Sequence, residues 1–395
     1  MVSVRQPYPE LDRNDHRIAL VYFPWKSRTI YKFLDQLVSI LIPISDSITL
    51  IGGNTEYLEI DDSRIVRAVD IRVKMHDTTD INPMLYSKAL WALKALSAQI
   101  LEAAMIIRDA SQIDIVVFYM SYPYDIVPLI TAKLLRKKTV IVVTRSNRLG
   151  TGPIDRFYDF QDRIMYAAVD VISPECNSLV APLKLMTYSP KLTAEGYRYV
   201  DLTRYRVKKG IGQRSNVGYV SRLEEQKGVL NFLNAAEILT DRGYTDIPFL
   251  VSGDGRMKAK VEARVDELKT KGVNIDYVNW IPEDDFCDYL NEFKLLVFPT
   301  TIYAAEGLPT IVIEAMACGT PVLTTAVAAI PNVIKDKSTG FLLENDSPEC
   351  IANGILKALT YSDVDKVAQQ ARALIENKFS YQGAVERWRK IVYGT

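Results

Sequence analysis

The sequence predicts an α/β protein built from two doubly wound, Rossmann-like domains that face each other across a central cleft. Short runs rich in β-branched residues alternate with longer amphipathic stretches, which is the pattern of parallel strands joined by helical crossovers. The alternation occurs in two consecutive series of similar length. A chain of 395 residues is also long enough for two hydrophobic cores.

The first series contains five strand-like runs. They are IALVYF (18–23), SITLIG (47–52), DIVVFYM (114–120), TVIVVT (139–144) and DVIS (170–173). Between them, segments such as RTIYKFLDQLVSIL have apolar residues at three- and four-residue spacing, which predicts helices that cover a sheet. We therefore assign residues 1–200 to an N-terminal Rossmann-like domain.

The second series follows a basic segment, RYRVKKGIGQRSN. Its strand-like runs are NVGYVSRL, IPFLVSGDG, VNIDYVNWI, KLLVFPT and PVLTT, again with helical patterns between them. The change of series predicts a boundary near residues 201–214 and a C-terminal Rossmann-like domain over 201–375. The last segment, 376–395, is expected to form a helix that packs back toward the N-terminal domain.

Composition and charge exclude several classes of protein. The 48 basic and 48 acidic side chains cancel, so no overall field draws the chain to nucleic acid. Four widely spaced cysteines and two histidines predict neither a metal site nor a disulfide framework, and a reducing compartment fits them. The N-terminal stretch lacks an apolar signal core, and no later run is apolar for about 18 residues. We expect a cytoplasmic protein, at most peripheral on the cytoplasmic face of the membrane.

The segment 298–325, FPTTIYAAEGLPTIVIEAMACGTPVLTT, carries the clearest chemical signal. Pro309 suits the first turn of a helix and Gly319 suits the position after the last turn, so we expect a helix between them. Seven residues separate Glu306 from Glu314, which places one carboxylate just ahead of this helix and the other roughly one turn inside it. Both side chains could therefore face one ligand.

This arrangement suits a phosphorylated sugar compound. A helix N-terminus offers unpaired N–H groups and a partial positive charge, so a phosphate could rest against Gly307 and Leu308. Glu314 could accept hydrogen bonds from a ribose diol, and Glu306 could hold sugar hydroxyls. The alternative is that the two carboxylates are a solvated loop residue and an exposed helix residue.

A second motif lies in VGYVSRLEEQKGVLNFLNAAEIL (217–239). Arg222 and Lys227 follow the end of a predicted strand, five positions apart. At the carboxyl end of a parallel strand, two cations can clamp a diphosphate, Arg through its planar fork and Lys as a point charge. Considered alone, such a pair is more often two surface cations than a phosphate clamp.

Together these fragments resemble glycosyltransferase family 4, the retaining nucleotide-sugar transferases of the GT-B fold. The matching pieces are SRLEEQKG for an Arg-x4-Lys motif, SGDG (252–255), VNWIPEDDF (278–286) and EGLPTIVIEAMACGTPV for a Glu-x7-Glu motif. The resemblance is close over residues 198–350, whereas the N-terminal half matches only in its pattern of elements.

The resemblance implies a donor site in the C-terminal domain. Arg222 and Lys227 would bind the donor diphosphate and stabilise charge on the leaving group, and Glu314 would bind the ribose. Gly253, in the SGDG turn, would line the donor cleft. Trp280 and Ile281 would lie around the nucleobase, with a core position as the alternative for the tryptophan.

The resemblance also implies a mechanism. Glu306 would face the transferred sugar as an electrostatic and positioning group, Arg222 and Lys227 would take the place of a metal ion, and no cofactor is expected. The function implied is the transfer of a hexose-type sugar from a UDP- or GDP-sugar to a glycan, a lipid-linked acceptor or a small molecule.

The N-terminal domain departs from the family pattern. Many relatives carry a glycine-rich loop after the first strand and a histidine after a later one, but here these segments are FPWKSRT and VVTRSN. Arg145 or Ser146 could take over contacts to the sugar or acceptor, or Arg145 could be a solvated loop cation. Tyr122 could line the acceptor side. The basic clusters KLLRKK (133–138) and RYRVKK (204–209) could touch anionic lipid, or could be a solvated helix end and a linker.

Three other functions compete with transfer. A Rossmann dehydrogenase is disfavoured because GIGQRS precedes a strand and lacks a third glycine. A sugar-nucleotide epimerase would be expected to lack the Glu-x7-Glu pair. A catalytically weak, nucleotide-sugar-binding or regulatory subunit on the same fold remains the alternative, because the N-domain histidine is missing.

Overall fold

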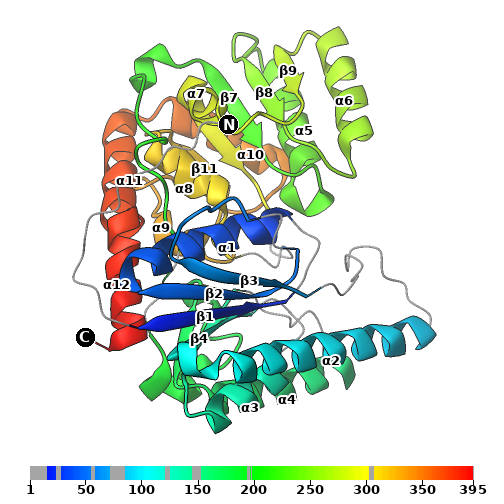
Figure 1. Cartoon of the computed structure of the whole chain (residues 1–395). Helices are drawn as coiled ribbons and strands as arrows, with labels where there is room; N and C mark the ends of the chain where they lie inside the picture. The colour runs from blue at the N-terminus through cyan, green and yellow to red at the C-terminus, as the bar shows by residue number, and fades with distance from the viewer. Residues whose placement is uncertain are drawn as a thin grey trace. The chain divides into compact units, whose positions relative to one another are not determined.

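The computed structural model describes residues 16–23, 28–54, 58–71, 85–120, 125–144, 153–193, 196, 198–301 and 307–394. The chain divides into two compact units (Figure 1). Unit 1 comprises Met1–Arg198 and Gln382–Thr395, and unit 2 comprises Tyr199–Tyr381.

Unit 1 contains a parallel sheet with helices on both faces. Its strands are β1 (Arg17–Tyr22), β2 (Ser47–Gly52), β3 (Ile65–Asp70), β4 (Ile115–Met120), β5 (Lys138–Val143) and β6 (Val171–Pro174). Its helices are α1 (Arg28–Leu41), α2 (Leu85–Arg108), α3 (Ile126–Leu134) and α4 (Pro153–Ala168), with short 3-10 helices at η1 (Ile42–Ile44), η4 (Ala110–Gln112), η5 (Asn177–Leu179) and η6 (Leu185–Lys191). Figure 1 shows α1 on one face of the sheet and α2, α3 and α4 on the other.

Unit 2 repeats this architecture. Its strands are β7 (Asn216–Val220), β8 (Phe249–Ser252), β9 (Ile275–Val278), β10 (Phe293–Phe298), β11 (Val322–Thr325) and β12 (Phe341–Leu343). Its helices are η7 (Ile211–Gln213), η8 (Glu225–Lys227), α5 (Val229–Asp241), α6 (Lys258–Thr270), α7 (Phe286–Glu292), α8 (Thr310–Ala317), α9 (Ile330–Val333), α10 (Pro348–Leu359) and α11 (Val364–Lys378).

The two sheets share one strand order. The order is β3-β2-β1-β4-β5-β6 in unit 1 and β12-β11-β10-β7-β8-β9 in unit 2, so in each unit the first strand lies beside the fourth. All the pairings are parallel. This is the doubly wound Rossmann order, in which ligands bind at the carboxyl ends of the strands where the order reverses. The predicted fold class is confirmed for each unit.

The two strands that the sequence analysis did not predict are both edge strands. β3 and β12 each have one neighbour. In β3 the Val66 side chain is exposed, and β12 is three residues long, so neither presents the continuous apolar run of a strand with two neighbours.

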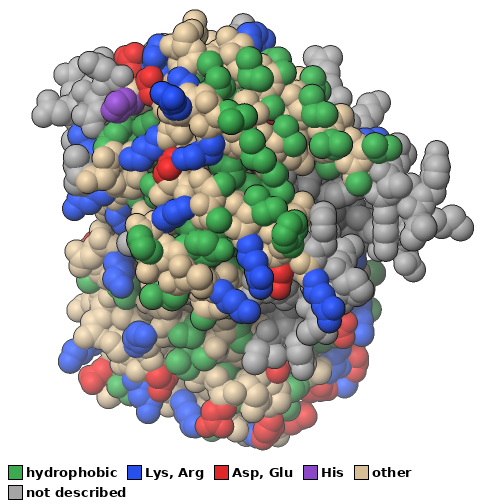
Figure 2. All heavy atoms as spheres, turned by 90° about the horizontal axis from the view of Figure 1, so that it is seen from below, with side chains coloured by type: hydrophobic (Ala, Val, Ile, Leu, Met, Phe, Trp, Pro, Cys, Tyr) green, Lys and Arg blue, Asp and Glu red, His purple; other side chains and the backbone are tan. Residues whose placement is uncertain are grey.

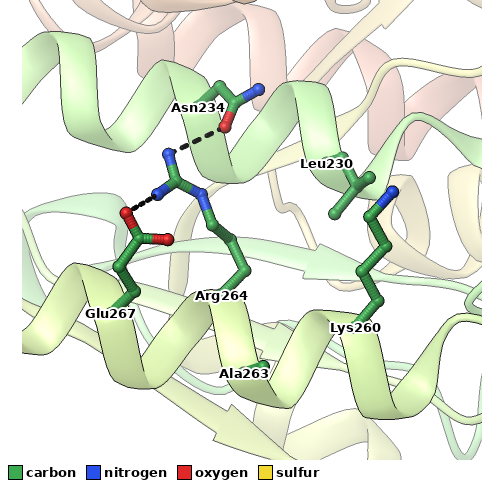
Figure 3. Close-up of a pocket in the computed structure, with 6 residues that line it drawn as sticks. All are labelled: Leu230, Asn234, Lys260, Ala263, Arg264 and Glu267. Atoms are coloured by element: carbon green, nitrogen blue, oxygen red, sulfur yellow. Dashed lines mark hydrogen bonds and ion pairs between the residues drawn. The ribbon is translucent and has the colours of Figure 1, made fainter.

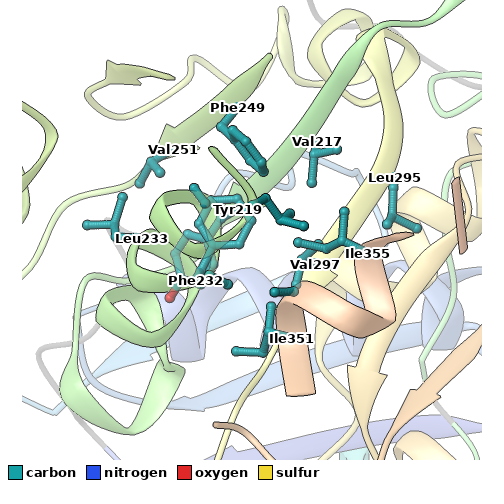
Figure 4. Close-up of a cluster of buried hydrophobic side chains, with 14 of the residues drawn as sticks. Val217, Tyr219, Phe232, Leu233, Phe249, Val251, Leu295, Val297, Ile351 and Ile355 are labelled. Carbon is teal, nitrogen blue, oxygen red and sulfur yellow. The ribbon is translucent and has the colours of Figure 1, made fainter. Parts of the chain in front are cut away.

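The core of unit 2 lies between its sheet and the helices α5 and α10. Figure 4 shows Tyr219, Phe232 and Phe249 together among aliphatic side chains. The ring centroids of Tyr219 and Phe232 are 5.6 Å apart, and those of Phe232 and Phe249 are 5.9 Å apart. Because Tyr219 is in the strand that precedes the Arg-x4-Lys motif, this core holds that strand end in place.

The last helix, α12 (Tyr381–Tyr393), lies in unit 1 from Gln382 onward. Its Trp388 is fully buried, and Arg387 Nε donates a hydrogen bond to the carbonyl oxygen of Gly196 at 3.3 Å. The helix begins at Tyr381, whereas the sequence analysis placed the terminal segment from residue 376, because α11 continues to Lys378. Among the described residues, every helix is too short or too polar to cross a bilayer.

Candidate functional site

Both sequence motifs of unit 2 lie at its topological switch point. β7 and β10 are the first and fourth strands of the unit and pair directly, with Gly218 opposite Leu296. The Arg-x4-Lys motif follows β7, and the segment that leads into α8 follows β10. The two motifs therefore leave the sheet at the carboxyl ends of neighbouring strands, which is where open α/β sheets bind their ligands.

The backbone of Gln226 joins the loops that follow these two strands. Its carbonyl oxygen accepts hydrogen bonds from the Thr301 N–H at 2.9 Å and from Thr300 Oγ1 at 3.1 Å. Two residues later, Gly228 has a φ of +75°, and a Cβ added there would lie 2.3 Å from the carbonyl oxygen of Pro299. The loop after β7 thus lies directly against the loop after β10.

Lys227 is buried at this junction. Its side chain is 4% exposed, and Nζ lies 5.8 Å from the centroid of the Phe298 ring. The Tyr219 hydroxyl donates a hydrogen bond to the Lys227 carbonyl oxygen at 3.2 Å, which connects the residue to the core. Burial and the nearby charge of Arg222 lower the pKa of Lys227 to about 8, although Glu224 opposes the shift. A nearby anion would favour the charged form of this ammonium and raise its pKa again.

Arg222, by contrast, is exposed. Its Nη1 lies 3.0 Å from Glu224 Oε1, and Gln226 Nε2 donates a hydrogen bond to the other carboxylate oxygen of Glu224. Exposed ion pairs of this kind contribute little to stability. The guanidinium can therefore exchange Glu224 for an anionic ligand at low cost.

The SGDG turn after β8 supports the Arg222 loop. Gly253 has a φ of +150°, and a Cβ added there would lie 1.9 Å from the Ser221 carbonyl oxygen. The Leu223 N–H donates a hydrogen bond to the Asp254 carbonyl oxygen at 2.9 Å. Glycine is required at 253 because the two backbones touch, and contact of Gly253 with a ligand stays a prediction.

The helix expected between Pro309 and Gly319 is present as α8. It begins at Thr310 rather than Pro309, because Pro309 has an extended ψ of 125° and acts as the N-cap. Gly319 has a φ of +66° and donates to the Met316 carbonyl oxygen, while the Thr320 N–H donates to that of Ala315. This pair of bonds is a Schellman motif, and it ends the helix at the predicted glycine.

Glu314 is buried in α8, with 6% of its surface exposed. The alternative of an exposed helix residue is therefore wrong. Tyr205, from the segment that precedes η7, has its hydroxyl near enough to the Glu314 carboxylate to feel its charge. Burial and the Glu314 carboxylate raise the pKa of Tyr205 well above its usual value. Gly307 and Leu308 stand just ahead of α8, with Leu308 buried.

Trp280 and Ile281, in the loop after β9, have opposite surroundings. Trp280 is 66% exposed, which excludes the core position considered as its alternative, while Ile281 is buried. β9 is the edge strand of its half of the sheet, separated from β7 by β8. The tryptophan is free to stack on a flat ring, whereas Ile281 can offer only the exposed remainder of its side chain.

The basic segment 204–209 is engaged by carboxylates of the same unit. Arg204 Nη1 lies 2.9 Å from Glu283 Oε1, Lys208 pairs with Asp288, and Lys209 pairs with Glu292. The lysine pairs hold this segment against α7. The linker reading of these cations is therefore favoured over a contact with lipid.

The contacts described above do not test every predicted site residue. Glu306, Tyr122, Arg145 and Ser146 lie outside the described residues. Within the described part of the chain, no group of His, Cys, Asp or Glu side chains has the arrangement of a metal site. Sequence reasoning missed Tyr205 and Thr300, because the residues near which they lie, Glu314 and Gln226 respectively, are distant along the chain.

A hollow of about 380 Å³ lies elsewhere in unit 2, between α5 and α6. It is lined by Leu230, Asn234, Lys260, Ala263, Arg264 and Glu267 (Figure 3). Arg264 spans it, with Nη1 2.7 Å from Glu267 and Nη2 donating a hydrogen bond to Asn234 Oδ1 at 3.0 Å. These contacts pair the guanidinium of Arg264 with neighbouring side chains. The residues that line the hollow belong to neither the Arg-x4-Lys nor the Glu-x7-Glu motif.

Comparison with known proteins relates this chain to glycosyltransferases. Residues 202–379 match the family model of glycosyl transferases group 1. The chain is 24% identical over 374 residues to the capsular polysaccharide biosynthesis glycosyltransferase CapM of Staphylococcus aureus, covering 88% of this chain and 94% of that protein. It is also 24% identical to the N-acetyl-alpha-D-glucosaminyl L-malate synthase of Bacillus anthracis, over 76% of this chain and 78% of that protein.

The chain is a glycosyltransferase. Its fold is GT-B, since its structure is similar to that of Anabaena Alr3699/HepE, solved in complex with UDP, with a TM-score of 0.72 and 14% identity over 95% of this chain and 100% of that one. The dehydrogenase and epimerase readings are set aside. For this glycosyltransferase, the roles of individual site residues stay predictions.

Proposed function

We propose that the protein is a retaining, metal-independent glycosyltransferase of family 4 that moves a hexose-type sugar from a UDP- or GDP-sugar. The observation that supports this most directly is the junction at Gln226. That junction brings the loop carrying Arg222 and Lys227 against the loop that leads into the helix of Glu314. Cations can bind a diphosphate, and a carboxylate can accept hydrogen bonds from the ribose attached to it.

We assign the parts of the donor to the parts of this junction. Lys227 and Arg222 bind the diphosphate, together with the N–H groups at Gly307, Leu308 and the start of α8. Glu314 accepts hydrogen bonds from the ribose, beside the hydroxyl of Tyr205. The exposed ring of Trp280, beside Ile281, stacks on the nucleobase, and Gly253 lets the ligand approach the backbone.

The reaction breaks the bond between the sugar's anomeric carbon and the donor phosphate oxygen. The acceptor oxygen forms the new bond on the same face of the sugar, and its proton passes to the departing phosphate. Lys227 and Arg222 stabilise the negative charge that develops on the leaving diphosphate, which is the task a divalent ion performs in other phosphate sites. Glu306 stabilises the positive charge that develops on the sugar ring, without forming a bond to it.

The relatives guide the choice of substrates. The Anabaena neighbour binds UDP, which makes a uridine diphosphate donor the first to test. The relatives named for a capsular polysaccharide and for a malate glycoside favour a glycan or a small hydroxylated acceptor, and a lipid-linked acceptor is included. Tyr122 and Arg145 are proposed to contact that acceptor.

The donor assignment is tested with a panel of UDP, GDP and ADP and their hexose conjugates. A ligand that binds only the folded state raises the unfolding temperature, so one base should stand out. The double variant Arg222→Ala, Lys227→Ala should lose most of that shift, because both proposed cations are removed. The control is Lys357→Ala with Lys366→Ala, two exposed lysines of unit 2 in α10 and α11. An undiminished shift in the Arg222 and Lys227 variant would contradict the assignment.

The role of Glu306 is tested by Glu306→Gln. Slow hydrolysis of the donor, followed as release of free sugar, provides a readout that needs no known acceptor. We expect hydrolysis to fall about a hundredfold while affinity for the nucleoside diphosphate stays nearly unchanged, because the carboxylate acts on charge that appears only in the transition state. Glu314→Gln should do the reverse and weaken nucleotide binding first. If Glu306→Gln lowers only the affinity for the nucleoside diphosphate and leaves donor hydrolysis unchanged, the proposed catalytic role of Glu306 is wrong.

A further inference from the structure

Three helices of unit 1 present a hydrophobic outer surface, which we call the helical face. α2 packs on α3, and α3 packs on α4, so the three form one layer (Figure 1). Figure 2, seen from below Figure 1, shows hydrophobic side chains gathered on this side with Lys and Arg among them. The large hydrophobic residues of these helices that are 45% to 79% exposed are Leu93, Leu96, Ile100, Leu101, Ile107, Ile130, Leu134 and Phe160.

The pattern in α2 is the reverse of an ordinary surface helix. Its outward stripe contains Leu93, Leu96, Ile100 and Ile107, at the spacing of successive helical turns. The side that faces the protein buries mostly small residues and a few polar ones: Ala95, Ala98, Gln99, Glu102, Ala103 and Ile106. Exposing large aliphatic side chains to water while alanines occupy the buried side is unfavourable in free energy, unless another surface covers the stripe.

The charges on the helical face have one sign along α2 and α3. The only carboxylates in the sequence of α2 and at the N-cap of α3 are Glu102 and Asp125, and both are buried. Burial raises the pKa of Asp125 to about 8, and burial with the charge of Asp125 raises that of Glu102 well above its usual value. Neither therefore offsets the cations at the surface.

Cations border the apolar residues. On α4, exposed Arg156 and Arg163 lie one turn on either side of exposed Phe160. The basic cluster 133–138 ends α3 and leads into β5. Lys133 pairs with Asp170 at 2.6 Å, and Arg136 is exposed. On α4 the partly exposed Asp159 also lies beside Phe160. Apolar groups with Lys and Arg near them can bind a surface of acyl chains beneath anionic headgroups.

We propose that the helical face docks on an anionic lipid bilayer. The leucine, isoleucine and phenylalanine side chains enter the boundary between headgroups and acyl chains, and the lysines and arginines contact headgroup phosphates. A second copy of this chain is a poorer occupant, because a symmetric contact would bring the same cations face to face. The proposal is independent of the donor site, which lies in unit 2.

Vesicle flotation tests the proposal with the full chain. The protein should float with phosphatidylcholine vesicles that contain phosphatidylglycerol, bind vesicles of phosphatidylcholine alone far less, and be partly released by high salt. Ile100→Glu with Phe160→Glu should lower the bound fraction at least about tenfold, because two apolar contacts are removed. Arg156→Gln with Arg163→Gln should weaken binding severalfold and flatten its salt dependence.

Matched controls are available in unit 2. Tyr244→Glu changes an exposed hydrophobic residue, and Lys357→Gln with Lys366→Gln changes two exposed cations; both variants should bind vesicles as the wild type does. Circular dichroism and thermal unfolding of every variant check folding, and the arginine variant tests the proposal even if the glutamate variant fails to fold. Failure of the wild type to float with anionic vesicles overturns the proposal. So does a concentration-dependent dimer, seen by sedimentation, that the same substitutions abolish.

Discussion

Lys227 illustrates a conflict between stability and function within one side chain. Its ammonium is buried beside Phe298 and near the positive charge of Arg222, and its pKa is lowered to about 8. The folded state therefore binds this proton less tightly than the unfolded chain does. An apolar residue here would avoid this cost of burying a charge, which agrees with the diphosphate-binding role that we propose for Lys227.

The pKa shift predicts that Lys227→Met stabilises the ligand-free protein. Below about pH 8 the folded wild type holds a desolvated charge, which destabilises it by up to about 3 kcal/mol for the shift from 10.5. Between about pH 8 and 10.5 the folded state has released the proton and the unfolded state has not, so wild-type stability rises with pH. The gain should thus be largest near pH 7 and nearly absent above pH 10.5, as measured by urea unfolding.

Arg222→Met is the matched control for this experiment. Arg222 is exposed and paired with Glu224, so its replacement should change stability much less. Both variants should bind nucleoside diphosphate more weakly if the donor assignment holds. A Lys227→Met protein that is less stable than wild type at pH 7 would show that burial of the ammonium is compensated by its contacts.

Glu314 and Tyr205 show the limit of sequence reasoning for single residues. The spacing of the motif identified Glu314 as a candidate, but could not decide whether its carboxylate was exposed. Tyr205 lies in a segment recognised only for its positive charge, and nothing local to it indicates a nearby carboxylate. Their proximity depends on where the folded unit places the segment before η7 relative to α8.

At the scale of elements, local signals placed the strands with two neighbours and the end of α8 well. A proline and a glycine bracket this helix, because each acts through its own backbone geometry. β3 and β12 were missed, because β3 carries the exposed Val66 and β12 is only three residues long, whereas the edge strands β6 and β9 were predicted. The junction of the loops after β7 and β10 was not visible either, since it joins segments distant along the chain.

That junction predicts a large penalty for Gly228→Ala. The alanine would have to adopt a φ of +75° and place its Cβ 2.3 Å from the Pro299 carbonyl oxygen, so the loop after β10 must move. We expect a loss of about 2–4 kcal/mol of unfolding free energy, together with weaker nucleotide binding.

Gly243→Ala separates backbone strain from crowding. Gly243 has a φ of +90° with nothing within 4 Å of an added Cβ, so only the strain of about 1 kcal/mol applies. Chemical denaturation of both variants gives the difference between them. Equal losses in the two proteins would mean that contact between the loops after β7 and β10 is not important for stability.

At the scale of the whole molecule, unit 1 and unit 2 share one strand order, but we propose a different role for each. The switch point of unit 2 gathers the motifs that we assign to the donor. Unit 1 turns large aliphatic side chains of α2 outward, and these are the basis of the proposed contact with lipid. Apolar spacing in the first series predicted helices that cover the sheet, but periodicity alone cannot tell which stripe of a helix faces inward when both stripes contain apolar residues.

The sequence by itself determined the alternation of strands and helices, the two series, and the positions of the Arg-x4-Lys and Glu-x7-Glu motifs at strand ends. These depend on short-range periodicity and on backbone preferences of single residues, which act over a few positions. The tertiary structure decided the strand order, the burial of Lys227 and Glu314, the proximity of Tyr205 to Glu314 and the exposed stripe of α2. Each of these arises from contacts between segments far apart in the chain, and local preferences carry no information about such pairings.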